Sequence, residues 1–298
     1  MSPLAIILVL LSASIHVGWN LVTKSSASPL AFSLLKGSTL MILAIIILPF
    51  IPLRSIPMNM WAYIAFSGMI HAVYIFSLST AYETGDISYV YPIARSAPAF
   101  VPIAAFLALG ETISLRGCLG IAIVVTCVFL IQLRGGAGSE LKRLWVSLKQ
   151  RDSRWAFTTL GSVVAYTLVD KAGMVTISSV TEITRGMHGP IFFMLETVVC
   201  YLLFWAYMIF CQKLPIGPVW RNEWPRAVAA AIGTMASYSL ILHVMQDEIV
   251  SYIVTLRQSS VLMAIVIGSI ALKEPYGRHR FIAAVGMLLG FYLVATAD

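Results

Sequence analysis

The chain has 298 residues, of which 59% are hydrophobic and only 11% are charged, and its mean hydropathy is +0.88. The charged share is about half that of a soluble domain, which excludes a water-soluble globular fold. The basic residues behind the formal charge of +7 are scattered over short loops, so we expect no nucleic-acid partner. The four cysteines show no CxxC spacing, and we expect neither a metal site nor structural disulfides.

Long apolar segments recur along the whole chain. At about 1.5 Å per residue, a helix of about 20 residues crosses a hydrocarbon core of about 30 Å. A transmembrane barrel would instead show alternating segments of about ten residues. The sequence therefore predicts an all-α integral membrane protein with ten transmembrane helices, at residues 3–22, 30–50, 59–80, 87–109, 117–133, 155–171, 187–211, 226–245, 249–272 and 280–296.

The longest connection, residues 134–154, begins with a glycine-rich stretch and continues with apolar residues at helical spacing among basic ones. This pattern is typical of an amphipathic helix on a membrane surface, and a solvated linker is an equal alternative. Together with the loops at 212–226 and 273–280 it holds twelve Lys or Arg residues, which places these connections in the cytoplasm and both termini outside. We divide the chain into a first five-helix repeat (1–133), the linker (134–154) and a second five-helix repeat (155–298).

Two segments of the chain repeat one another. Residues 87–111 and 249–274 both begin with Ile, carry an arginine eight residues later (Arg95 and Arg257), and end in Ala-Leu-x-Glu. Because each half has an odd number of crossings, the second half must enter the membrane upside down relative to the first. Inverted repeats of this kind are typical of secondary transporters, in which the substrate site lies near the bilayer midplane between the halves.

These motifs carry a family resemblance. Gly18-Trp19-Asn20 through Lys24, the block from Arg95 to Glu111, and its copy from Arg257 to Glu274 resemble the ten-helix EamA-like branch of the drug/metabolite transporter superfamily. The resemblance implies a secondary transporter whose central cavity is lined by the first, third, fourth, sixth, eighth and ninth helices. It does not indicate the substrate, because this branch carries amino acids, sugars, nucleotide derivatives and other metabolites.

Arg95 and Arg257 lie about 12 Å along the axes of their predicted helices, inside the hydrocarbon region, where a charge is costly. One interpretation is that they flank the cavity and bind an anionic group of the substrate through their guanidinium nitrogens. The alternative is that each arginine caps a broken neighbouring helix or pairs with a carboxylate such as Glu196. The sequence leaves both interpretations open.

Polar and aromatic side chains also stand out in the helices that the resemblance places around the cavity. Besides the two arginines, the candidate substrate contacts are Trp19, Asn20, His71, Tyr74, Tyr166, Tyr238 and Gln258. Each of these could instead be a packing or interhelix hydrogen-bonding residue. Glu196, near the middle of the seventh helix, is a candidate for ion coupling or a structural partner of an arginine.

The predicted function is a secondary transporter of a small polar metabolite, anionic or zwitterionic, such as an amino acid, an organic acid or a phosphonate. It would work by alternating access in the bacterial inner membrane. A flippase for a lipid-linked substrate and a membrane-embedded enzyme are the alternatives. The chain has no HExxH or GxSxG motif and no pair of carboxylates within one membrane helix, so we expect neither an enzyme nor a bound cofactor. The expected partners are the substrate and the lipid bilayer, with a homodimer left open.

Overall fold

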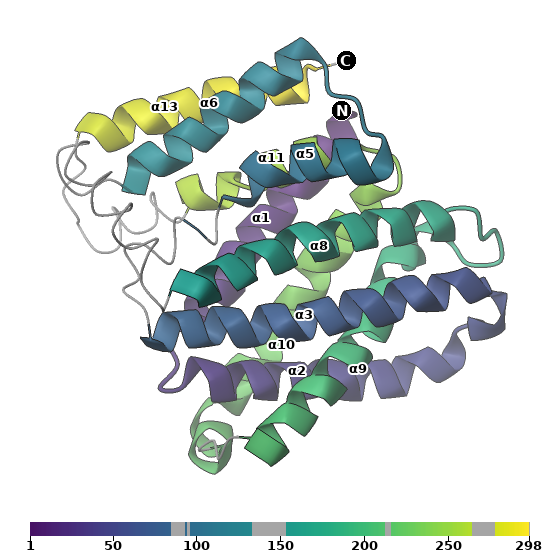
Figure 1. The fold of residues 1–298 in the computed structure, drawn as a ribbon. Coiled ribbons are helices and arrows are strands. Elements are labelled where there is room, and N and C mark those ends of the chain that lie inside the picture. Colours follow the sequence, from purple (N-terminus) through teal and green to yellow (C-terminus); the bar gives the residue numbers. More distant parts are fainter. Residues whose placement is uncertain (85–92, 94–95, 133–152, 212–215, 264–277, 298) are drawn as a thin grey trace. The chain divides into compact units, whose positions relative to one another are not determined.

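The computed structural model describes residues 1–84, 93, 96–132, 153–211, 216–263 and 278–297. In this part of the chain the regular secondary structure is entirely helical, with two short 3-10 turns at Leu48–Phe50 and Leu53–Ser55. The α-helices are α1 (Pro3–Lys24), α2 (Pro29–Ile47), α3 (Met58–Thr84), α5 (Ala97–Leu109), α6 (Leu115–Gln132), α8 (Ser153–Ile177), α9 (Arg185–Cys211), α10 (Ile216–Met245), α11 (Val250–Leu256) and α13 (Arg278–Ala295) (Figure 1). One of them lies in each predicted segment, which confirms the all-α fold.

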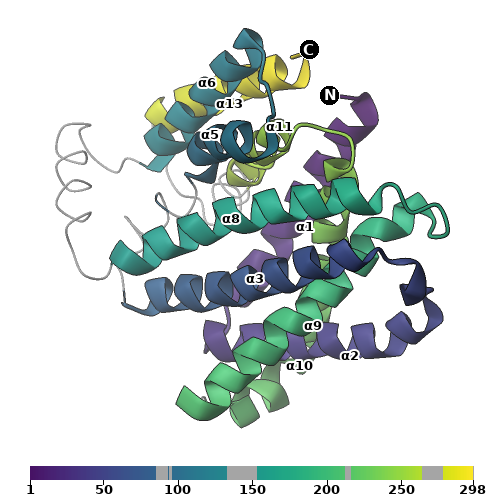
Figure 2. The same ribbon diagram turned by 45° about the vertical axis from the view of Figure 1, so that its right-hand side comes forward.

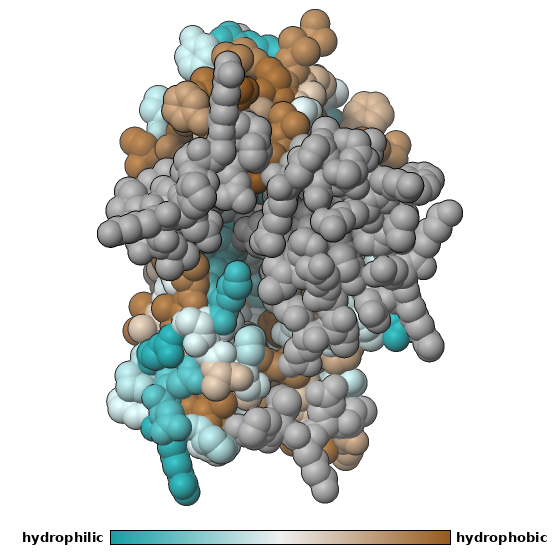
Figure 3. Space-filling view, turned by 90° about the vertical axis from the view of Figure 1, so that its left-hand side faces the viewer, coloured by the Kyte–Doolittle hydropathy of each residue, from teal (hydrophilic) through white to brown (hydrophobic). Residues whose placement is uncertain are grey.

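The helices have the composition of membrane spans. Six of them, α1, α2, α3, α8, α9 and α10, are long and apolar enough to cross a membrane, and α5, α6 and α13 are shorter apolar helices. Large apolar side chains project outward: Ile45, Leu107 and Leu288 are 64%, 76% and 60% exposed. Figure 3 shows hydrophobic residues over much of the described surface on one face. Lipid solvates such a surface well and water does not, so the chain is an integral membrane protein.

The helices form two compact units. One unit consists of Met1–Leu10, Ser77–Val164 and Glu248–Asp298, and the other consists of Leu11–Phe76 and Ala165–Asp247. We call them the first and the second unit. Each unit takes helices from both halves of the chain, so this spatial division differs from the division along the chain into two repeats. The repeats therefore stay a prediction from the sequence.

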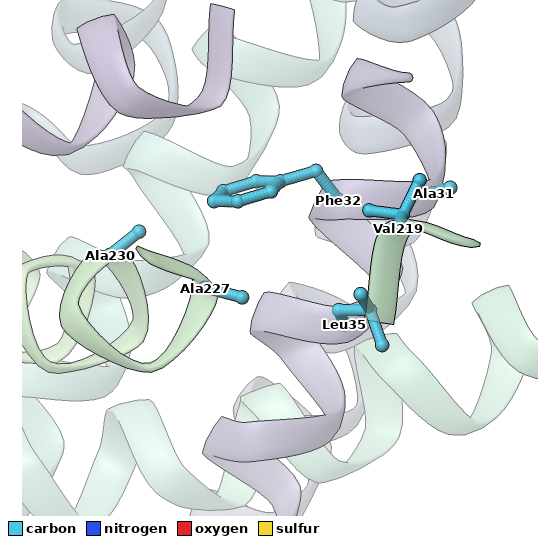
Figure 4. Close-up of a cluster of buried hydrophobic side chains, with 6 residues drawn as sticks. All are labelled: Ala31, Phe32, Leu35, Val219, Ala227 and Ala230. Carbon is cyan, nitrogen blue, oxygen red and sulfur yellow. The ribbon is translucent and has the colours of Figure 1, made fainter. Parts of the chain in front are cut away.

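In the second unit, α10 packs against α2 through buried apolar side chains. Phe32 of α2 points toward Ala227 and Ala230 of α10, whose small side chains let the two helices approach (Figure 4). The same helix also bonds to α1, where the Ser12 hydroxyl donates to the carbonyl oxygen of Ser237 at 2.7 Å. The second unit is therefore joined both by close packing and by polar contacts between helices.

In the first unit, α6 and α13 lie side by side (Figures 1 and 2). A Cβ atom added at Gly120 would lie only 2.8 Å from the carbonyl oxygen of Gly290, so the close approach requires glycine. The same unit pairs α5 with α11. There Glu111 accepts a hydrogen bond from the Val250 N–H at the start of α11, at 3.0 Å. A carboxylate in this place satisfies a backbone donor that the helix itself leaves unbonded.

Two helices extend beyond their predicted ends. Their additional turns contain charged residues, which find hydrogen-bond partners in other parts of the chain. The sequence places the end of the sixth helix at residue 171, but α8 continues to Ile177. Asp170 is fully buried, and Lys171 donates to the Met245 carbonyl oxygen at 2.8 Å. The eighth helix begins at Ile216 instead of residue 226, since Glu223 accepts a hydrogen bond from the Ser26 hydroxyl at 3.1 Å. The helix predicted within 134–154 lies almost wholly outside the described residues.

Replacing Gly290 by Ala should lower the thermal stability of the purified protein. The added Cβ would meet Val124 Cγ2 at 2.6 Å, so the contact between α6 and α13 would have to open. Overpacking of this kind costs about 1–3 kcal/mol. Gly161→Ala in α8 is the matched control, because a Cβ there has nothing within 4 Å and gains helix propensity. Thermal unfolding in detergent measures both variants, and equal melting temperatures would contradict the assigned contact.

Candidate functional site

Four helices of the second unit, α3, α8, α9 and α10, bring polar side chains together. Ser67 and His71 lie one turn apart on α3, and Tyr166 and Asp170 lie one turn apart on α8, so each pair shares one helix face. One residue each from α9 and α10 completes the group. We call it the polar cluster, and its members are Ser67, His71, Tyr166, Asp170, Glu196 and Tyr238.

Two carboxyl groups form the centre of the polar cluster. Asp170 and Glu196 are 0% and 1% exposed, in helices that cross the membrane. The Ser67 hydroxyl lies in hydrogen-bond contact with both of them, at Asp170 Oδ1 and Glu196 Oε2. The other oxygen of Asp170 accepts a hydrogen bond from the Tyr238 hydroxyl. Contacts of this kind supply the partners that polar groups need where neither water nor lipid can supply them.

His71 lies beside the carboxyl pair. Its Nδ1 atom is 3.1 Å from the Ser67 carbonyl oxygen and 3.8 Å from Glu196 Oε2. Because a carbonyl oxygen only accepts, the contact with it is a hydrogen bond in the tautomer that carries a proton on Nδ1. Among the described residues, His71, Asp170 and Glu196 offer metal-ligating atoms within 4.8 Å of one another. In that tautomer Nδ1 has no lone pair for a metal, so the hydrogen bond to the carbonyl oxygen and coordination through Nδ1 exclude one another.

Tyrosine rings enclose the His71 side chain. Tyr166 stacks on it with ring centroids 4.1 Å apart, and Tyr238 meets it edge-on at 5.5 Å. Tyr74 in turn packs edge-on against Tyr166, also at 5.5 Å. The structure thus brings together four of the predicted substrate contacts, His71, Tyr74, Tyr166 and Tyr238, next to the predicted coupling residue Glu196. Aromatic faces with polar tips can hold a small molecule that has both apolar and polar parts.

The candidates on α1 lie near a buried lysine. Trp19 faces Lys36 of α2, whose Nζ atom lies 4.0 Å from the ring centroid. Asn20 donates to the carbonyl oxygen one turn earlier in its own helix, at 3.0 Å. Lys36 is only 6% exposed. The second unit therefore holds a buried positive group in addition to the polar cluster, which the sequence analysis did not include among the site residues.

Neither of the two predicted arginines is among the residues that define the polar cluster. Arg95 lies outside them, so the expectation that the arginines oppose each other stays a prediction. Arg257 belongs to the first unit and follows α11 as its C-cap, with its N–H donating to the Ile253 carbonyl oxygen at 2.9 Å. The helix predicted over 249–272 is interrupted here by a turn at Arg257 and Gln258, where the N–H groups of Gln258 and Ser260 donate to carbonyl oxygens only three residues back instead of four. Gln258, at the same interruption, is 7% exposed.

Sequence reasoning missed two members of the polar cluster, Asp170 and Ser67. Asp170 stood next to the predicted end of its helix, at residue 171, and was not among the candidate residues. Its spacing of four residues from Tyr166 was the available signal, because it places both on one helix face. Ser67 has the same spacing from His71. A sequence pattern of two carboxylates within one helix does not reveal this pair, because α8 supplies Asp170 and α9 supplies Glu196.

Comparisons with known proteins agree with this architecture. Residues 3–133 match the EamA-like transporter family. A solved structure titled "Crystal structure of protein" is similar over 97% of this chain and 96% of that chain, with a TM-score of 0.72 at 13% sequence identity, so the two share a fold. A search of curated proteins gave no match.

Residues 3–133 of this membrane protein thus carry the pattern of a transporter family. The resemblance to the EamA-like branch of the drug/metabolite transporter superfamily is confirmed over residues 3–133, and the similarity to the solved structure shows a shared fold over nearly the whole chain. The match indicates a drug or metabolite transporter role. It says nothing of which residues bind the substrate.

Replacing Tyr238 by Phe should destabilise the protein while leaving the ring contacts with His71 in place. The variant loses the hydroxyl that donates to Asp170, and a hydrogen bond to a charged group contributes about 1.5–3 kcal/mol. Tyr292→Phe on the outer face of α13 is the control, since Tyr292 is 60% exposed. Thermal unfolding in detergent would show a lower melting temperature for Tyr238→Phe only. A Tyr238→Phe variant as stable as the control would contradict the assigned bond.

Proposed function

We propose that the chain is a secondary transporter of a small polar metabolite that is anionic or zwitterionic, working by alternating access. The observation that carries the proposal is the EamA-like family match, joined to a buried group of polar and aromatic side chains within membrane-crossing helices. Buried polar side chains inside a membrane protein usually line a substrate or ion path. Amino acids, organic acids and phosphonates are the substrate classes that we infer.

The buried Lys36 supports a substrate that carries negative charge. Lys36 lies in α2 over the Trp19 ring, in the unit that also holds the polar cluster. A cation held on an aromatic face inside the membrane can attract a carboxylate, phosphate or phosphonate group that enters the site. Arg95 and Arg257 are further proposed contacts for such a group. The tyrosine rings would hold the remainder of the substrate.

Replacing Lys36 by Met should abolish uptake into proteoliposomes, because Met keeps the length of the side chain but removes the buried charge. The compounds to test are radiolabelled alanine, succinate and 2-aminoethylphosphonate, which represent the three substrate classes. Lys24→Met is the matched control, since Lys24 is exposed at the end of α1. Size-exclusion chromatography verifies that both variants are folded. Undiminished uptake by Lys36→Met would remove this lysine from the substrate site.

The charge distribution also supports an orientation in the proposed bacterial inner membrane. Twelve Lys or Arg residues in the linker and two neighbouring loops favour the cytoplasmic side. A single cysteine introduced at Ser139 in a variant without native cysteines should resist an impermeant thiol reagent in intact cells and react after permeabilisation. A cysteine at the N-terminal Ser2 should react in intact cells. The reverse labelling pattern would invert the proposed topology.

A further inference from the structure

The contacts of Ser67 require one more proton than its hydroxyl carries. Ser67 Oγ lies in hydrogen-bond contact with Asp170 Oδ1 and with Glu196 Oε2. Each oxygen-oxygen contact at this range needs a proton between the two atoms. The hydroxyl has one proton and can serve only one of the two carboxyl groups. The other contact needs a proton that belongs to a carboxyl group.

Neither the bond from Tyr238 to Asp170 nor the contacts of His71 with Ser67, all among the described residues, supplies that proton. The Tyr238 hydroxyl donates to Oδ2 of Asp170, the oxygen that Ser67 does not touch. His71 Nδ1 lies 3.1 Å from the Ser67 carbonyl oxygen and 3.2 Å from Ser67 Oγ, and a proton donated from it to the serine would not lie between Ser67 and a carboxyl oxygen. A metal cation cannot replace the proton, because even a small cation needs about 2.0–2.6 Å to each oxygen and would separate oxygens that are here in direct contact. One of the two carboxyl groups is therefore protonated.

From this geometry we infer that Asp170, Ser67 and Glu196 form an exchangeable proton-binding site that takes up and releases one proton in each transport cycle. This inference rests on the proposed transport function and assigns its driving ion.

Two protonation forms interconvert through the serine. In one form Glu196 holds the proton and donates to Ser67, which donates to Asp170. In the other form Asp170 holds the proton, and Ser67 donates to Glu196. Passage between them moves one proton from Glu196 to Ser67 and one from Ser67 to Asp170, with no net change in charge. The hydroxyl of Tyr238 stabilises negative charge on Asp170, which favours the form with the proton on Glu196.

Release transfers the proton to water on the side of the membrane to which the site is open. The negative charge left on the carboxyl pair must then be balanced by other groups within the membrane. The protonated and the deprotonated pair therefore require different surroundings. Among the described residues, the titratable side chains around the pair are His71 on α3, Tyr166 on α8, Cys200 on α9 and Tyr238 on α10, with Tyr74 packed against His71 and Tyr166, and Lys36 on α2 in the same unit. Lys171, beside Asp170 in the chain, is directed to the Met245 carbonyl oxygen.

Infrared spectroscopy tests the proton without any substrate. The wild-type protein should show the carbonyl stretch of a protonated carboxyl group at neutral pH, and this band should shift in D₂O. Glu196→Gln and Asp170→Asn should each lose it. Glu223→Gln, which removes a buried carboxyl group bonded to Ser26, is the matched control and should keep it. Ser67→Ala should change the frequency of the band, because the carboxyl group loses its hydrogen-bond partner.

Transport assays test the coupling. In proteoliposomes, a gradient of one pH unit should sustain up to about tenfold accumulation of whichever compound the wild type carries among alanine, succinate and 2-aminoethylphosphonate. Glu196→Gln should lose this accumulation but keep the exchange of labelled for unlabelled compound, since exchange needs no net proton movement. Glu223→Gln should keep both.

The outcomes separate the two proposals. An unchanged carboxyl band in both Glu196→Gln and Asp170→Asn, or a wild-type spectrum without the band, would overturn the proton site. Accumulation driven by a Na⁺ gradient and not by a pH gradient would overturn it as well. If the wild type carries none of the three compounds under any gradient, the proposed substrate classes fail, while the infrared band still decides the proton site.

Discussion

Polar groups inside a hydrocarbon layer must find their partners within the protein, and the arrangement of the second unit depends on this constraint. Asp170 and Glu196 come from two helices, yet both bond to one hydroxyl of a third helix. Tyr238 adds a donor from a fourth. An unmet bond would cost more here than at a protein surface, because no water replaces it. The polar cluster therefore fixes the relative positions of α3, α8, α9 and α10 more narrowly than apolar packing alone.

Small residues determine where the helices approach most closely. Gly120 and Gly290 remove side chains between α6 and α13, while Ala227 and Ala230 accommodate the Phe32 ring between α2 and α10. Lipid is as apolar as the side chains it contacts, so burial of apolar surface contributes little to helix association in a membrane. Close packing and interhelix hydrogen bonds must supply most of it. The two units use both.

The boundaries of α8 and α10 show how tertiary contacts override local sequence signals. A charged pair such as Asp170-Lys171 is typical of a helix end at the membrane surface. It can lie inside α8 because Asp170 bonds to Ser67 and Tyr238, and Lys171 bonds to a backbone carbonyl oxygen. The start of α10 also carries charged residues, and the sequence therefore predicted a loop there. These partners lie about 70 or more residues away along the chain, and local composition does not record them.

The sequence by itself determined the membrane class, the all-α fold and three ring-bearing members of the polar cluster, His71, Tyr166 and Tyr238, because hydropathy and periodicity are local properties. It also singled out Glu196. Only the tertiary structure decided that Glu196 bonds with Ser67 and lies beside Asp170 and His71, instead of pairing with an arginine among the described residues. The physical reason is that a shared proton depends on distances between atoms of different helices. Helical spacing predicts which residues share a face, but packing alone decides which faces meet.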